Sequence, residues 1–254
     1  MLQQSLIKLL AAAGIGSRRQ LAATIKRGGV KVNGQTVVNY IHPVDVQKDT
    51  VTIDGIGVVL NSEKVLYLML NKPKGIVSTA EDEQGGTTIF DIIPGKYRSV
   101  HLYPVGRLDK DSIGLMLITN DGQLTFNLTY PRFHHEKEYL VHIQGVLTPD
   151  QIMNLERGIE LSDGRTSPAK INAVKITPFN YSMIIHEGKK HQVRRMFAAL
   201  GYRVLDLKRV RIGSLLLGTL PEGQARELTT EEVKALKIKV ITVGNKSDPK
   251  GVVQ

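Results

Sequence analysis

The spacing of apolar residues in the first 60 positions predicts a small domain of two helices and a hairpin-rich sheet. Leucine, isoleucine and alanine recur at helical spacing over residues 5–14 and 17–29, and glycines follow both stretches. Over residues 30–38 and 49–60, apolar and polar positions alternate around Asn-Gly and Asp-Gly pairs, which is typical of β-hairpins. We therefore expect one domain over residues 1–61.

After a short polar linker, the pattern changes to longer apolar strands interleaved with helices. Residues 65–75 predict a buried strand that ends near Pro73, because proline cannot continue a central ladder. Further strands are predicted at 114–119, 138–146, 169–176, 181–188 and 204–213, and helices at 148–158 and 192–201. The expected architecture is an α+β domain over residues 65–243, followed by a disordered tail over 244–254.

The net charge of the chain indicates that the protein binds a polyanion. Of 254 residues, 34 are Lys or Arg and 24 are Asp or Glu, which gives a formal net charge of +10. A chain this basic is expected to meet nucleic acid or an anionic membrane. No apolar stretch approaches the ~18–20 residues that span a bilayer, and the N-terminus lacks a signal-peptide pattern. We therefore expect a cytoplasmic protein whose partner is nucleic acid.

The residue types exclude several kinds of chemistry. The chain contains no Cys, which excludes disulfides, zinc fingers, Fe–S ligation and thiol nucleophiles. The pair His134-His135 has no partner at metal-ligand spacing. His135 could line a site, but the pair is more typical of an exposed loop. Phosphate-binding and dinucleotide-binding fingerprints are absent, and so is a G-x-S-x-G elbow. We expect no metal and no cofactor.

The stretch "GRLDKDSIGLMLITNDG" holds the carboxylate with the most unusual setting. Asp109 follows Arg107 by two residues and precedes a nearly unbroken apolar run, and Asp111 is a rival of the same type. An aspartate beside a buried strand is held rigidly, and a dry wall strengthens its electrostatic interactions. This stretch is therefore the candidate catalytic centre.

The N-terminal domain resembles the S4 RNA-binding domain over roughly residues 3–50. The resemblance rests on "GIGSRRQ" at the start of the second helix and on "VKVNG" after it. A helix N-terminus with two arginines suits phosphate oxygens. The residues expected to contact RNA in this domain are Arg18, Arg19, Lys26, Arg27 and Lys31.

The remainder resembles the RsuA/RluB/RluE/RluF family of rRNA pseudouridine synthases. Five motifs occur in the family's order: "NKPKG", "GRLDKDSIGLMLITNDG", "KEYLVHIQG", "EGKKHQVRRMF" and "LKRVRIG". The resemblance implies a catalytic domain with a long mixed, mostly antiparallel sheet flanked by helices. It also implies cofactor-independent isomerisation of a uridine to pseudouridine in ribosomal RNA, a reaction that breaks a C–N bond and forms a C–C bond.

The family motifs assign catalytic roles to Asp109, Tyr139 and Arg194. Asp109 would be the nucleophile, as glycosidase carboxylates are. Arg194 would pair with Asp109, because a nearby cation offsets the cost of burying a charged carboxylate; Arg195 is the alternative one position on. Tyr139 would stack on the flipped uracil and help to move the C5 proton.

Other residues are expected to hold the substrate RNA. The residues predicted to bind the flipped nucleotide are Arg107, Val193, Lys72 and Gln192. Lys74, Lys208, Arg209 and Arg211 are predicted to contact backbone phosphates, and strand alternation puts Arg209 and Arg211 on one side.

Several alternatives are compatible with the same motifs. Members with this length favour large-subunit (23S) rRNA, while small-subunit (16S) rRNA synthases share every motif. The other interpretations are a non-catalytic RNA-binding assembly factor, which would show damage at the catalytic positions, and a nucleotide glycosidase, which would need a paired carboxylate. Attack at C1′, attack at C6 and a glycal route all fit the motif. We expect a monomer that acts on free rRNA or on a pre-ribosomal particle.

Overall fold

The computed structural model describes residues 4–60, 65–79, 82, 85–98 and 100–244. They form two compact units, one from the described residues within Met1–Val65 and Lys96–Leu102, the other from those within Leu66–Gly95 and Tyr103–Gln254. The predicted linker at 61–64 and the predicted tail, apart from Gly244, lie outside the described residues.

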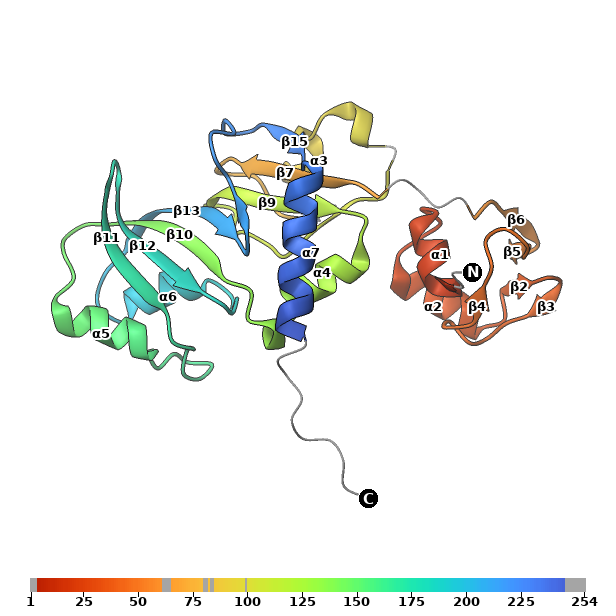
Figure 1. Cartoon of the computed structure of the whole chain (residues 1–254), viewed down its shortest axis with the longest axis horizontal. Helices are drawn as coiled ribbons and strands as arrows, with labels where there is room; N and C mark the ends of the chain where they lie inside the picture. Colours follow the sequence, from red (N-terminus) through yellow and green to blue (C-terminus); the bar gives the residue numbers. More distant parts are fainter. Residues whose placement is uncertain (1–3, 61–64, 80–81, 83–84, 99, 245–254) are drawn as a thin grey trace, which may run out of the picture. The chain divides into compact units, whose positions relative to one another are not determined.

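The first unit consists of two helices and short strands, as the hydrophobic pattern predicts (Figure 1). Its helices are α1 (Leu6–Ala12) and α2 (Arg18–Lys26). Its strands are β1 (Gln4–Ser5), β2 (Val30–Val32), β3 (Gln35–Thr36), β4 (Pro43–Val44), β5 (Val51–Ile53) and β6 (Ile56–Val58). The sheet order is β3-β2-β5-β6, and β1 pairs with β4.

Local sequence explains why these elements form where they do. Ser17 and Gln20 make the reciprocal capping box at the start of α2. The first hairpin turns at Asn33 and Gly34, both with positive φ, as a type I′ turn requires. The apolar faces of both helices and the strands bury one shared core. The helices therefore leave their basic residues at the surface.

The second unit is built on one nine-stranded sheet in the order β11-β12-β10-β13-β9-β7-β15, with β14 beside β13 and β8 beside β9. The strands are β7 (Tyr67–Lys72), β8 (Tyr103–Pro104), β9 (Ile113–Thr119), β10 (Lys137–Ile143), β11 (Lys170–Ile176), β12 (Phe179–Ile185), β13 (Val204–Ile212), β14 (Leu215–Leu216) and β15 (Ala225–Glu227). All pairs are antiparallel except β13 with β9. The expected mixed, mostly antiparallel sheet is confirmed.

The parallel contact between β9 and β13 depends on a glycine. Gly114 has φ +105° and pairs with Arg209. A Cβ at this position would overlap the backbone of Arg209. Only glycine therefore allows the two strands to approach so closely.

A bulge between β10 and β13 corrects the prediction that Arg209 and Arg211 share a side. Tyr139 pairs with Arg209, and its neighbour Glu138 pairs with Arg211, so Val210 is an extra residue on β13. Because adjacent residues of β10 point to opposite faces, the two arginines do so as well. Arg209 shares the face of Tyr139, and Arg211 shares that of Glu138.

Helices cover the sheet and include two that the hydrophobic pattern did not reveal. The helices are α3 (Ile89–Ile92), α4 (Gly122–Thr129), α5 (Pro149–Arg157), α6 (Gln192–Ala198) and α7 (Thr230–Gly244), with short 3-10 turns at Gly95–Tyr97 and Pro131–Phe133. We predicted neither α4 nor α7. Both pack side by side over a core that includes Met69, Leu115 and Ile212 (Figure 1). Helix α5 lies against β11, and α6 lies against β13.

Within the described ranges, no helix is long and apolar enough to cross a membrane.

Candidate active site

Asp109 lies in the loop between β8 and β9, and hydrogen bonds hold that loop on both sides. The backbone N–H of Leu108 donates to the Ser78 hydroxyl over 3.2 Å, and that hydroxyl donates to the Leu108 carbonyl over 2.6 Å. The N–H of Ser112 donates to the Asp109 carbonyl over 3.0 Å. The side chain of Asp109 itself remains about one-third exposed. The loop therefore presents a carboxylate whose backbone is fixed.

Lys72 supports the same loop from inside the protein, and this differs from the predicted contact with substrate. The residue is fully buried. Its ammonium donates to the carbonyl oxygens of Pro73, Lys110 and Ser112 at 3.0, 3.2 and 2.9 Å. Burial lowers the pKa of Lys72 to about 8, while the charges of Asp109 and Asp111 act to raise it. Lys72 thus anchors the loop, and its ammonium is engaged by backbone carbonyls inside the protein.

His191 is a basic residue that contacts the Asp109 carboxylate. Its Nε2 atom lies 3.3 Å from Oδ1 of Asp109. His191 has a left-handed backbone with φ 52° and directly precedes α6. This turn puts its ring beside the Asp109 loop. The sequence offered a weak signal for this role, because a lone histidine before a helix has many other uses.

Arg194 does not form the ion pair with Asp109 that the family motif predicts. Its guanidinium donates to the carbonyl oxygens of Val204 at 3.0 Å and Asp111 at 3.3 Å. The alternative, Arg195, forms a bidentate pair with Asp163 at 2.8 and 2.9 Å. In this structure, Arg194 therefore connects α6 to β13 and to the Asp109 loop through backbone atoms.

A small cavity of about 80 Å³ brings Asp109 together with four other predicted site residues, one of which is Gln192. Tyr139 enters from β10, Val193 from α6 and Arg107 from the loop that precedes Asp109. Tyr139 and Val193 are almost fully buried. A carboxylate beside an aromatic ring and an apolar wall can hold a flat, uncharged base next to a nucleophile.

Gln192 also lines this cavity, but its amide is used within the protein. The amide nitrogen donates to the carboxylate of Glu187, and the amide oxygen accepts from the backbone N–H of Lys189 over 2.9 Å. The residue is 3% exposed. Gln192 therefore shapes the loop before α6, which differs from its predicted contact with substrate.

Some of the residues predicted to contact phosphate are exposed and without an ion pair among the described residues, whereas others pair with a carboxylate of the protein. Arg18, Arg19, Lys26 and Lys31 are exposed on the first unit. Arg27, also exposed, pairs with Asp54 at 2.6 Å, and Lys74 lies 3.7 Å from Asp206. Lys208 is partly exposed.

Arg211 and Arg209 are the two predicted phosphate contacts with the least exposure. Arg211 bonds Glu138 at 2.9 Å and Glu136 at 3.1 Å. Its charge is thus matched inside the protein, which speaks against a phosphate contact. Arg209 is 2% exposed and forms the wall of a separate pocket beside Tyr139.

Histidines and carboxylates in the described ranges form no group of three or more arranged to hold a metal ion. The pair His134-His135 is divided: His134 is exposed, whereas His135 is 2% exposed and lines the pocket beside Tyr139. The expectation of an exposed loop pair is therefore wrong for His135.

Comparisons with known proteins identify relatives along nearly the whole chain. Residues 66–199 match the RNA pseudouridylate synthase family, and residues 4–50 match the S4 domain. The chain is 39% identical over 238 residues to the ribosomal large subunit pseudouridine synthase B of Bacillus subtilis (strain 168), covering 92% of this chain and 96% of the relative. It is also 39% identical over 234 residues to an uncharacterized RNA pseudouridine synthase, YtzG, of the same organism, covering 90% and 96%. A crystal structure of a pseudouridylate synthase matches with a TM-score of 0.66 at 34% identity, covering 93% of this chain and all of that one.

Proposed function

The chain belongs to the RNA pseudouridylate synthase family, and we propose that it converts a specific uridine of large-subunit ribosomal RNA to pseudouridine. The observation that carries the proposal is the cavity that joins Asp109 to Tyr139 and Val193 within a family-matched domain. The ribosomal target is supported by the similarity to the large subunit synthase of Bacillus subtilis, which spans nearly all of both chains.

We propose that Asp109 is the nucleophile of the isomerisation. The bond between C1′ of the ribose and N1 of uracil breaks, and a bond between C1′ and C5 forms. The proton on C5 leaves, and N1 gains one, so atoms and electrons balance without an external reactant. A carboxylate on a fixed loop suits the covalent step, because its backbone does not have to reorganise during the reaction. Attack at the sugar, attack at C6 and a glycal route all begin from this carboxylate position.

Tyr139 and Val193 are proposed to enclose the flipped base. The Tyr139 ring offers a stacking face, and its hydroxyl can take part in moving the C5 proton. Val193 supplies an apolar wall on the α6 side of the cavity. Arg107 lies at the rim of the same cavity and is exposed, which suits it to hold the phosphate of the extruded nucleotide.

The S4 domain is proposed to bind RNA through its exposed cations. Arg18 and Arg19 open α2, whose N-terminus also attracts phosphate, and Lys26 and Lys31 follow on the same unit. The net charge of +10 favours a polyanion. We place this activity in the cytoplasm, with free rRNA or a pre-ribosomal particle as substrate. Residues 1–61 and 65–243 are the proposed domain bounds.

Pseudouridine mapping on both unmodified rRNAs tests the proposal. Carbodiimide labelling followed by primer extension would compare the wild-type chain with Asp109→Asn. The expected result is one new stop in large-subunit rRNA that is absent with the variant. RNA binding by both proteins, measured at two salt concentrations, serves as the control for folding and recognition.

The other outcomes separate the alternatives. A stop only in small-subunit rRNA would contradict the target but keep the reaction. A third outcome is that no stop appears in free rRNA or in a pre-ribosomal particle, while RNA binding remains sensitive to salt. This outcome would favour a non-catalytic binding protein. A stop that persists with Asp109→Asn would show that another residue is the nucleophile.

A further inference from the structure

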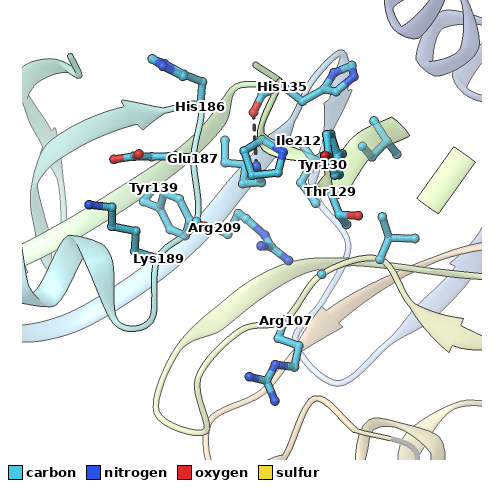
Figure 2. Close-up of a pocket in the computed structure, with 16 residues that line it drawn as sticks. Arg107, Thr129, Tyr130, His135, Tyr139, His186, Glu187, Lys189, Arg209 and Ile212 are labelled. Atoms are coloured by element: carbon cyan, nitrogen blue, oxygen red, sulfur yellow. Dashed lines mark hydrogen bonds between the residues drawn. The ribbon is translucent and has the colours of Figure 1, made fainter. Parts of the chain in front are cut away.

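A second, larger pocket of about 420 Å³ lies beside the Asp109 cavity, and the proposed isomerisation does not use most of its lining. Figure 2 shows Arg209 in its centre, with Tyr139 on one side and Tyr130 on the other. His135 and His186 lie at one end of this view, and Arg107 at the other. The volume falls within the range of about 300–1,000 Å³ that is typical of small-ligand sites.

In the described structure, two cations line this pocket without an ion-pair partner: Arg209, which is buried, and Lys137, which is partly exposed. Arg209 donates through Nε to the Leu115 carbonyl over 2.8 Å, but its buried Nη2 has no hydrogen-bond partner among the described residues. Lys137 donates to the His135 carbonyl over 3.3 Å. Within the described part of the chain, neither cation forms an ion pair. Burial, followed by the charge of Arg209, lowers the pKa of Lys137 to about 8. Two like charges in a partly dry site are costly until an anion joins them.

Glu187 is the one carboxylate among the residues that line the pocket, and it is already engaged. Its Oε1 accepts from the backbone N–H of Ser167 over 2.9 Å, and its Oε2 accepts from the Ser167 hydroxyl over 3.2 Å. The amide of Gln192 also donates to it. Glu187 is therefore held by the neighbouring loops, and it forms no salt bridge with Lys137 or Arg209.

The pocket also has the walls that a nucleobase requires. Val105, Leu128 and Ile212 form an apolar side. On the rim, Tyr130 is 45% exposed, and the guanidinium of Arg132 lies 5.1 Å from its ring centroid. An exposed aromatic ring beside cations is a combination by which proteins bind single-stranded nucleotides.

The pocket and the Asp109 cavity adjoin, because Arg107, Tyr139, Gly188 and Lys189 line both. We propose that this pocket binds the nucleotide next to the target uridine, with its phosphate on Lys137 and Arg209 and its base against the ring of Tyr130. The inference rests on the proposed function, since it assumes that RNA enters the Asp109 cavity. A free anion would fill only the cationic part and leave the apolar wall and Tyr130 without a contact.

Phosphate ethylation interference tests this subsite for any target uridine, because every phosphate of the RNA is sampled. Transcripts of the rRNA domains would be ethylated at random, bound to the wild-type chain or to Lys137→Met, and separated into bound and free RNA. In the wild type, ethylation of one phosphate next to the modified uridine should weaken binding about tenfold. With Lys137→Met this interference should vanish, and the slope of log affinity against log salt should fall by about 1.

Matched variants separate the pocket from general effects. Lys175→Met removes an exposed lysine that lines neither pocket, and should keep the wild-type interference. Tyr130→Leu should weaken binding about tenfold through lost stacking. Phe179→Leu, which alters a partly exposed ring that lines neither pocket, should not.

Two results would overturn the subsite: unchanged interference with Lys137→Met, or a Lys137-dependent phosphate far from the modified uridine. A free-anion site would instead leave RNA binding by Tyr130→Leu unchanged. Pseudouridine formation by the wild type is measured on the same transcripts. Its absence would overturn the proposed function, whereas the Lys137-dependent phosphate is read from binding alone, so the two failures are distinguishable.

Discussion

The imidazole of His191 lies 3.3 Å from the carboxylate of Asp109. The two residues are far apart in the chain, because His191 precedes α6 and Asp109 precedes β9. His191 is half exposed, and its backbone is in the left-handed region. Such a contact orients the carboxylate, and solvent weakens its energetic effect. We therefore predict that His191 positions the proposed nucleophile.

Replacing His191 should slow the reaction without weakening RNA binding. For His191→Ala we expect a single-turnover rate of pseudouridine formation about two- to fivefold lower, in keeping with the small energy of an exposed side-chain contact. His191→Gln, whose amide can still donate to Asp109, should recover part of the rate. Equal rates for wild type and His191→Ala would contradict the positioning role, and melting temperatures would control for folding.

Lys72 should matter for stability before it matters for chemistry. In Lys72→Met, three carbonyl groups lose a donor inside the protein, so the free energy of unfolding should fall by about 2–4 kcal/mol. Urea unfolding would measure this change. Lys74→Met, in the same motif but exposed, should change stability by less than about 0.5 kcal/mol. If Lys72→Met is as stable as the wild type but binds RNA more weakly, the result would support the predicted contact between Lys72 and the substrate.

Arg211 offers a direct test of a structural role against an RNA-binding role. Because its guanidinium bridges Glu136 and Glu138, Arg211→Met should lower the free energy of unfolding by about 1–3 kcal/mol. The salt dependence of RNA binding should stay that of the wild type. A slope that falls by about 1 would instead identify a phosphate contact.

The stability of the protein should rise between about pH 8 and pH 10.5. Burial lowers the pKa of both Lys72 and Lys137 from 10.5 to about 8. In this window the unfolded chain binds more protons than the folded one, so their contribution to the unfolding free energy increases with pH. Below pH 8 both states are protonated, and the cost of burying the charges is fully present. Urea unfolding from pH 7 to 10 should show a weaker rise for Lys137→Met, and an unchanged one for Lys175→Met.

Local sequence patterns predicted much of the fold. The helix that follows Ser17, the turn at Asn33-Gly34 and the helix predicted over 148–158 each depend on residues a few positions apart, and the structure confirms all three. Helix α4, which begins after the cap Asp121, was missed because its apolar face spans only two turns. The candidate site around Asp109 could also be located from the sequence, because the Arg-Leu-Asp run and the apolar strand that follows it are contiguous.

The tertiary structure alone decided which side chains meet. The bulge at Val210 sends Arg211 to Glu138 and leaves Arg209 with Tyr139, against the simple alternation of a strand. His191, and not Arg194, reaches Asp109, because the backbone turn before α6 sets the direction of the side chain. Sequence determines local conformation through short-range sterics and hydrogen bonds. Register, bulges and burial join residues far apart in the chain, so only the folded structure fixes the partners of each charge.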